Sequence, residues 1–86
     1  MTGDIAQRAA LIDAVDQAIA GKWDDAHAAC QSMEGDKTAD WLHAILHKIE
    51  GDESNARYWY RRSGQSYESW GDAQDELKAI KAVLTY

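Results

Sequence analysis

The stretch Gly51-Asp-Glu-Ser-Asn-Ala-Arg-Tyr-Trp-Tyr-Arg-Arg-Ser-Gly64 holds the clearest helix start of the chain and its densest group of aromatic and basic residues. Gly51 suits the left-handed conformation that ends a helix, and Asp52 or Ser54 offers an oxygen to the free N–H groups that begin the next one. At about 100° per residue, one face of this helix collects Ala56, Trp59, Tyr60 and Ser63. The stretch therefore predicts a turn between two antiparallel helices, with a small alanine at their contact.

The composition indicates one small helical domain over residues 1–86. A chain of this length buries only about 60 to 65% of the surface that it exposes when unfolded, so its large side chains matter individually. It has no proline, and its four Trp and four Tyr supply rings whose polar atoms each need a partner or a place at the surface.

The charge and the chain start bear on location and partners. A net charge of −6 disfavours unspecific binding to nucleic acid or to an anionic membrane. No apolar run approaches the length of a membrane span, and the start Met-Thr-Gly-Asp lacks the features of a signal peptide. The lone Cys30 has no partner for an intrachain disulfide. We therefore expect a cytoplasmic protein without a membrane or nucleic-acid partner.

Apolar residues at helical spacing predict five helices, over 4–20, 23–34, 36–50, 51–64 and 72–84, and no pattern of a strand occurs. They group into a first hairpin (4–34), a second hairpin (36–64) and a C-terminal capping helix (70–85). The residues expected to face inward on the helices outside 51–64 include Ile5, Leu11, Ile12, Val15, Ile19, Ala26, Ala29, Cys30, Met33, Leu42, Ile45, Leu46, Ile49, Leu77, Ile80, Val83 and Leu84.

The two predicted hairpins are weakly similar to each other. A shift of 30 residues aligns five identical pairs, namely Ala9/Ala39, Ala14/Ala44, Ile19/Ile49, Gly21/Gly51 and Ala26/Ala56. In each unit a glycine is followed five residues later by an inward alanine, and four residues beyond that by a larger residue. This pattern resembles the turn and second helix of tetratricopeptide-like repeats. The resemblance implies an all-α, right-handed stack of two hairpins that is capped by the fifth helix.

A second resemblance covers roughly residues 20–64. Trp23-Asp-Asp-Ala-His27, Trp41-Leu-His-Ala-Ile-Leu-His47, Glu50-Gly-Asp52 and Asn55-Ala-Arg-Tyr-Trp-Tyr-Arg-Arg62 resemble a group of small, mostly bacterial helical proteins of uncharacterised function. The resemblance implies a site shared by His27, His43, His47, Glu50 and the arginines, and it names no reaction.

The histidines themselves suggest a metal site. His43 and His47 stand four residues apart on the third predicted helix, and Glu50 lies one turn further on. With His27 from the second helix, they could offer three or four ligands to Zn²⁺ or a similar transition metal. The alternatives are acid–base chemistry or hydrogen bonds, either across the helices or to the side chains of Asp13, Asp36 and Asp40.

The basic residues of the fourth helix suggest a binding surface. Arg57, Arg61 and Arg62, with an exposed Tyr58, could hold a carboxylate, a phosphate or a stacked base. The alternative is that nearby carboxylates neutralise these arginines as ion pairs, and the candidates are Glu50, Asp52, Glu53 and Glu68.

A tetratricopeptide-like curvature would also create a concave surface for a peptide. The residues expected there are Arg8, Leu11, Val15, Thr38, Trp41, Ile45 and Lys48. Two alternatives stay open, because the fifth helix or a second copy of the chain could cover the same residues.

The leading functional hypothesis is an interaction module without a cofactor. It would bind a protein segment or an anionic group through Trp41, Arg57, Tyr58, Arg61 and Arg62. The alternative hypotheses are a small metal-binding protein that uses His27, His43, His47 and Glu50, and a structural homodimer subunit. No catalytic residue is predicted, because no serine is followed or preceded by a base at a recognisable spacing.

Overall fold

The computed structural model describes the backbone of residues 2–86 and the side chains of residues 5–86. Within this range the chain is helical and contains no strand. Its elements are α1 (Thr2–Ile19), α2 (Trp23–Ser32), α3 (Lys37–Ile49), α4 (Glu53–Ser63), a short 3-10 turn η1 (Tyr67–Ser69) and α5 (Ala73–Thr85). The predicted all-α fold is therefore confirmed. The polar segment between α4 and α5 contains η1.

Aspartates define the starts of three helices. The Asp36 side chain accepts hydrogen bonds from the backbone N–H groups of Thr38 and Ala39, so it is Asp36 rather than Thr38 that caps α3. Asp52 accepts from the N–H of Asn55 and caps α4. Asp72 caps α5 in the same way. Each carboxylate satisfies helix N–H groups that would otherwise lack an acceptor.

The two hairpin turns have the same geometry. Gly21 and Gly51 both adopt the left-handed conformation, with φ of 84° and 85°. Each donates its N–H to the carbonyl three residues earlier, Gly21 to Ala18 and Gly51 to Lys48. This conformation is strained for residues with a Cβ, so both turns depend on glycine.

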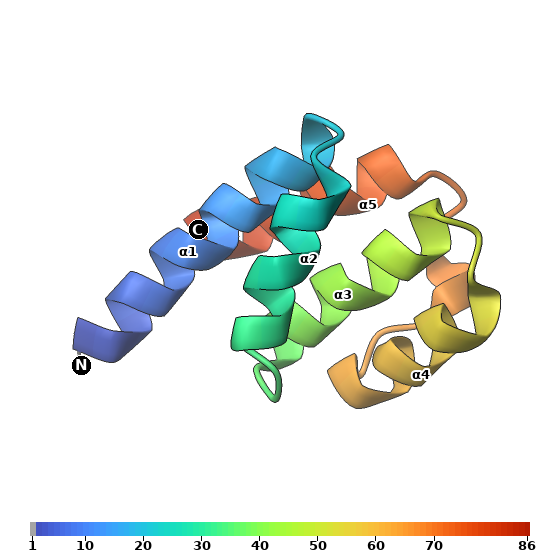
Figure 1. Ribbon diagram of the computed structural model, residues 1–86, viewed down its shortest axis with the longest axis horizontal. Coiled ribbons are helices and arrows are strands. Elements are labelled where there is room, and N and C mark those ends of the chain that lie inside the picture. The colour runs from blue at the N-terminus through green and yellow to red at the C-terminus, as the bar shows by residue number, and fades with distance from the viewer. Residues whose placement is uncertain (1) are drawn as a thin grey trace.

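Helix α3 lies at the centre of the molecule and packs against α2, α4 and α5, and also touches α1 (Figure 1). The central part of its apolar face is fully buried, with Leu42, Ile45 and Leu46 at 0% exposure. Ala56 of α4 and Ala26 of α2 are equally inaccessible. These small side chains allow α4 and α2 to approach their neighbouring helices closely, as the sequence predicts.

Helix α5 runs alongside α1 and α3 (Figure 1). It turns Leu77, Ile80 and Leu84 into the core. The apolar residues expected on a concave peptide-binding surface, which are Leu11, Val15, Trp41 and Ile45, are all buried. The sequence left open whether the fifth helix or a second copy of the chain covers these residues. Within a single chain, α5 covers them.

Three residues expected in the core are instead exposed. Ile5 is 74% exposed, because the first turns of α1 extend past the other helices (Figure 1). Ile49 is 44% exposed at the last residue of α3. Val83 is 59% exposed, although Glu76, two turns earlier on the same side of α5, is buried. At Ile5 and Ile49 the apolar stripe continues to a helix end that the neighbouring helices leave exposed. Leu84, the next residue after Val83, is still buried, so Val83 lies at the edge of the buried face of α5.

Across residues 2–86, no helix combines the length and apolar character needed to cross a membrane.

Candidate functional site: a cluster of three histidines

Three histidines from two helices converge between α2 and α3. His43 and His47 lie one turn apart on α3, and the packing of α2 against α3 brings His27 opposite them. One ring nitrogen of each histidine lies within 4.8 Å of the corresponding nitrogens of the other two. The closest pair is Nε2 of His27 and Nε2 of His43, 3.1 Å apart. The i, i+4 spacing indicated the α3 pair, whereas only the helix packing places His27.

Glu50 orients the third histidine of the cluster. Its Oε1 lies 2.6 Å from Nδ1 of His47, a distance typical of a strong hydrogen bond to a carboxylate. This contact occupies Nδ1 and leaves Nε2 of His47 available to another partner. Glu50 is thus tied to His47 rather than placed as a fourth member of the cluster: it groups with His47 and Asp52, not with all three histidines.

Two tryptophans hold the other two imidazole rings. The indole of Trp23 stacks on His27, with ring centroids 4.5 Å apart and an interplanar angle of 15°. The indole of Trp59 stacks on His43 at 3.9 Å and 14°. Trp23 is itself fixed, because its Nε1 donates a 2.7 Å hydrogen bond to the carbonyl of Leu46. The histidine rings therefore have little freedom to rotate.

His43 has an unusual environment for a charged or polar group. It is 4% exposed, and its Nδ1 is buried without a hydrogen-bond partner. Burial, together with electrostatic repulsion of the protonated ring by His27, His47 and Arg62, lowers the pKa of His43 to about 4. Burial and the neighbouring His47 also lower the pKa of His27. Both imidazoles are thus neutral at pH 7 and keep a lone pair for a ligand.

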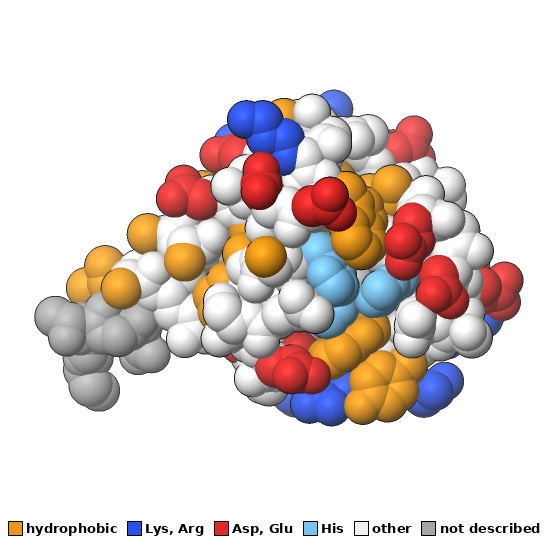
Figure 2. All heavy atoms as spheres, in the orientation of Figure 1, with side chains coloured by type: hydrophobic (Ala, Val, Ile, Leu, Met, Phe, Trp, Pro, Cys, Tyr) orange, Lys and Arg blue, Asp and Glu red, His pale blue; other side chains and the backbone are white. Residues whose placement is uncertain are grey.

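The cluster is accessible from one side of the molecule. Figure 2 shows histidine side chains at the surface in the middle of one face, bordered by apolar and acidic side chains. His27 is only partly buried, whereas His47 is 9% exposed. The cluster therefore reaches the surface on this face, and His27 is its most exposed member.

The aspartates that the sequence offered as alternative partners serve other roles. Asp36 caps α3, and Asp40 accepts from the N–H of Gly35 and lies 3.9 Å from Arg62. Among the described residues, neither these two nor Asp13 forms a hydrogen bond with a histidine. The predicted contact across helices is present, between His27 and His43.

Cys30 lies outside the cluster, in the core, as the sequence predicts. Burial, with a contribution from Asp40, raises the pKa of its thiol to about 12. The thiolate is the form that binds metals and attacks electrophiles, so Cys30 is chemically inert in the folded protein.

The arginines expected to bind an anion are partly neutralised. Arg57 pairs with Glu53 at 2.8 Å and with Glu68 at 2.7 Å, and its guanidinium lies over the ring of Tyr67. These are two of the four carboxylates that the sequence suggested as partners. Because all three groups are substantially exposed, the pairs neutralise charge more than they stabilise the fold.

Arg61 and Arg62 differ from each other. Arg62 donates to the hydroxyl of Tyr58 at 3.0 Å and lies over the ring of Trp59, 5.0 Å from its centroid. It therefore borders the histidine cluster through Trp59. Arg61 has no ion pair within the described part of the chain, and it lines a shallow pocket with Arg57 and Tyr67.

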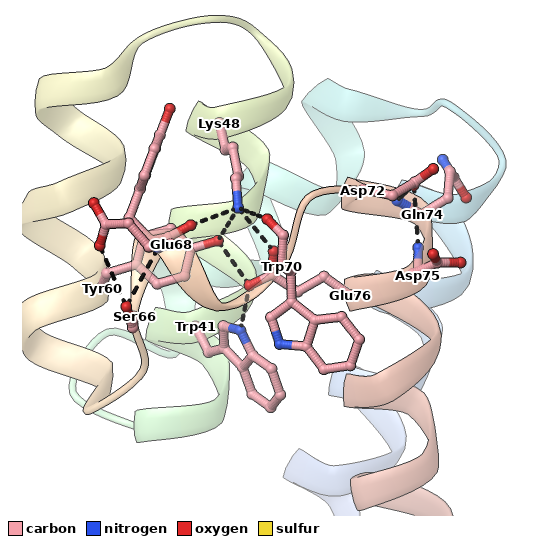
Figure 3. A network of polar contacts seen from close by, with 11 residues as sticks. Trp41, Lys48, Tyr60, Ser66, Glu68, Trp70, Asp72, Gln74, Asp75 and Glu76 are labelled. Carbon is pink, nitrogen blue, oxygen red and sulfur yellow. Dashed lines mark hydrogen bonds and ion pairs between the residues drawn. The ribbon is translucent and has the colours of Figure 1, made fainter.

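Trp41 is 7% exposed and belongs to a buried polar network, not to an open surface. Its Nε1 donates to Oε2 of Glu76 at 2.8 Å, and the hydroxyl of Tyr60 donates to the same oxygen at 2.7 Å. Lys48 Nζ lies 3.3 Å from Oε1 of Glu76 and also donates to the carbonyls of Tyr67 and Trp70 (Figure 3). The network joins α3, α4, the η1 segment and α5.

Sequence reasoning did not identify Glu76 or the stacked tryptophans of the cluster. One signal for Glu76 was available, because it stands four residues before Ile80 and so shares the apolar side of α5. A carboxylate in that position requires a buried partner.

Comparison with known proteins yields no family model, no curated protein and no solved structure that matches this chain. The resemblances to tetratricopeptide-like repeats and to small bacterial helical proteins therefore stay predictions, and the functional argument rests on the site itself.

Proposed function

We propose that this protein binds a transition metal ion, Zn²⁺ or a similar divalent ion, through His27, His43 and His47. The observation that carries the proposal is the convergence of three imidazoles from two helices, with one nitrogen of each within 4.8 Å of the others. Neutral imidazole is the form of histidine that ligates metals, and burial favours it here for His27 and His43.

The distances suit a tetrahedral ion. Zn–N bonds of about 2.0 to 2.1 Å place two nitrogen ligands roughly 3.3 Å apart. The nitrogens of His27 and His43 are 3.1 Å apart. The remaining separations, at most 4.8 Å, require only a small approach of the rings.

The contact between Glu50 and His47 is also typical of metal sites. A metal-bound histidine commonly donates its second N–H to a carboxylate, which fixes the tautomer and makes the imidazole a better ligand. Glu50 holds Nδ1 of His47 at 2.6 Å and so directs Nε2 to the role of ligand. Glu50 thus contributes as a positioning residue, in place of the direct ligand that the spacing suggested.

The donor set restricts the choice of metal. Three imidazoles without a thiolate favour Zn²⁺, Cu²⁺ or Ni²⁺ over Ca²⁺ and Mg²⁺, which prefer oxygen ligands.

Binding of a protein segment or an anion stays a prediction with weaker support. Of its five residues, Trp41 is buried in the Glu76 network and Arg57 is paired with two carboxylates. The homodimer hypothesis likewise stays a prediction with weaker support, because α5 already covers the residues that a second copy would bury.

The first test is calorimetric titration of the chelator-treated protein with Zn²⁺. We expect one ion per chain, bound in the micromolar range or tighter, and a Glu50→Gln variant that binds about 10 to 100 times more weakly. Glu53→Gln is the matched control, because Glu53 is an exposed carboxylate three residues away that pairs only with Arg57. We expect this control to bind Zn²⁺ like the unaltered protein.

A ligand variant and a stability measurement complete the test. His27 is partly exposed, so His27→Gln removes a ligand with little effect on folding, and circular dichroism would verify its helix content. Saturating Zn²⁺ should stabilise the unaltered protein by more than about 1 kcal/mol and leave His27→Gln nearly unchanged. Absence of stoichiometric binding of Zn²⁺, Cu²⁺ and Ni²⁺ would refute the proposal.

A further inference from the structure

We infer that the metal ion bound by the three histidines keeps one coordination position open to solvent, where a water molecule exchanges with a small anion. This inference rests on the proposed metal site, and it assigns that site a ligand class. Ions with four protein ligands have structural roles, whereas an ion with an open coordination position can bind and activate an external ligand.

The first support is the number of ligands that the chain offers. In the part of the chain that the structure describes, no fourth histidine, cysteine or carboxylate joins the group of His27, His43 and His47. Glu50 is held by Nδ1 of His47, and Asp52 is occupied by the N-terminus of α4 and the side chain of Asn55. A four-coordinate ion would therefore have three protein ligands and one from solvent.

The second support is access. His27 is partly exposed, and Figure 2 shows histidine side chains at the surface of one face, while His43 and His47 are 4% and 9% exposed. The stacked indoles of Trp23 and Trp59 lie against the faces of His27 and His43 and leave no polar atom to occupy the open position. The nitrogen of Trp23 is already used in its hydrogen bond to Leu46.

The third support is charge. Three neutral imidazoles add no negative charge to a divalent ion, and Glu50 reaches it only through the His47 ring. The ion would thus have no carboxylate bound to it directly, and Glu50, Asp52 and Asp24 would compensate its charge only through space. Arg62, which lies over Trp59 beside His43 and 3.9 Å from Asp40, adds a positive charge near the cluster. A monoanion at the open position would relieve this excess.

The exchange itself requires no other reactant. The metal–water bond breaks, the water leaves for solvent, and a lone pair of the anion forms the new bond to the metal. No electron is transferred, and the anion stays intact.

The test uses the full-length protein loaded with Co²⁺, whose visible absorption reports the number and kind of its ligands, with azide as the probe anion. We expect a band of tetrahedral Co²⁺ that shifts on addition of azide and saturates at one azide per metal. Equilibrium dialysis run in parallel would show whether the cobalt stays bound. Glu53→Gln serves again as the control, with the same azide affinity as the unaltered protein.

The possible results separate the two proposals. A saturable shift with retained cobalt supports the open position. A tetrahedral cobalt band that does not change in excess azide would overturn the open position and leave the metal site standing. Loss of cobalt to azide would also overturn it, because the anion would then compete with the protein for the ion. A protein that binds no Co²⁺, Zn²⁺ or Cu²⁺ would refute the metal site and the open position together.

Discussion

Burial gives the residues of the cluster properties that their types alone do not imply. An exposed histidine titrates near pH 6.5. His43 instead is buried, faces two other histidines and has Arg62 nearby, and each of these features disfavours its protonated form. Residues of the same type on the surface of α3 would behave ordinarily. The neighbours, not the residue type, make His43 a candidate ligand.

This environment predicts a pH dependence for the metal-free protein. The pKa of His43 falls from 6.5 in the unfolded chain to about 4 in the folded one. The folded state binds this proton less readily, so the associated stability is complete above pH 6.5, declines as the pH falls and is lost below about 4. We expect a loss of up to about 3 kcal/mol from this residue, because one pKa unit corresponds to about 1.4 kcal/mol.

Urea unfolding at several pH values in the presence of chelator would measure this decline. His43→Gln removes the titrating group, so its stability should fall less over the same range, while the carboxylates contribute equally to both proteins. An NMR titration that places the pKa of His43 at or above 6.5 would contradict the interpretation.

At the scale of elements, α3 and α4 form the hairpin that supports the cluster. Ala56 sits at 0% exposure near the start of α4, and α4 packs against α3 after the Gly51 turn. Trp59, one turn later, then reaches His43. The fit between these helices therefore determines both the core and the position of one ring of the site.

Enlargement of Ala56 should disturb this contact. We expect Ala56→Leu to lower the free energy of unfolding by about 1 to 3 kcal/mol, since added methylene groups in a filled core force neighbouring side chains out of their preferred rotamers. Arg61→Ala on the exposed side of the same helix is the control and should change stability by less than about 0.5 kcal/mol. Chemical denaturation would measure both. A harmless Ala56→Leu would show that the α3–α4 contact is looser than the structure indicates.

At the scale of the whole molecule, one buried ion pair connects the central helix α3 with the C-terminal helix α5. Glu76 on α5 is 0% exposed and receives hydrogen bonds from Trp41 on α3 and Tyr60 on α4. Lys48 compensates its charge and also holds two carbonyls of the segment between α4 and α5. The network therefore fixes how α5 sits on the rest of the fold (Figure 3).

Removal of the charge of Lys48 alone should thus destabilise the fold more than removal of the charges of both Lys48 and Glu76. Lys48→Met leaves Glu76 charged and buried, and we expect a loss of about 3 to 5 kcal/mol in the free energy of unfolding. The double variant Lys48→Met, Glu76→Gln should be more stable than Lys48→Met alone, because the glutamine oxygen still accepts hydrogen bonds and carries no charge.

The control for this pair is Lys81→Met. Lys81 pairs with Asp16 at 2.7 Å, but both side chains are about half exposed, at 45% and 48%. We expect a change below about 1 kcal/mol for this variant. A double variant that is less stable than Lys48→Met would show that the charge of Glu76 is not what the lysine compensates.

The local features of the fold could be predicted from the sequence because they depend on nearby residues. Gly51 and the caps Asp36 and Asp52 mark helix ends through their own backbone and side-chain chemistry, and the apolar spacing of α3 sets its buried face. The i, i+4 pair His43 and His47 follows from helix geometry alone. These predictions do not depend on how the helices are arranged.

The tertiary structure alone decided which faces are covered and which distant residues meet. Whether α5 extends the stack or lies over α1 and α3 depends on the sum of many contacts, and this choice buries Trp41 and leaves Val83 exposed. The meeting of His27 with His43 likewise depends on the packing angle of α2. The sequence by itself determined the helices, their ends and the histidine pair on α3, because these depend on interactions within a few residues. The contact of His27 with the α3 pair, which the sequence offered as an alternative, and the Lys48–Glu76 network required the fold, because they join residues 16 to 35 positions apart that only helix packing brings together.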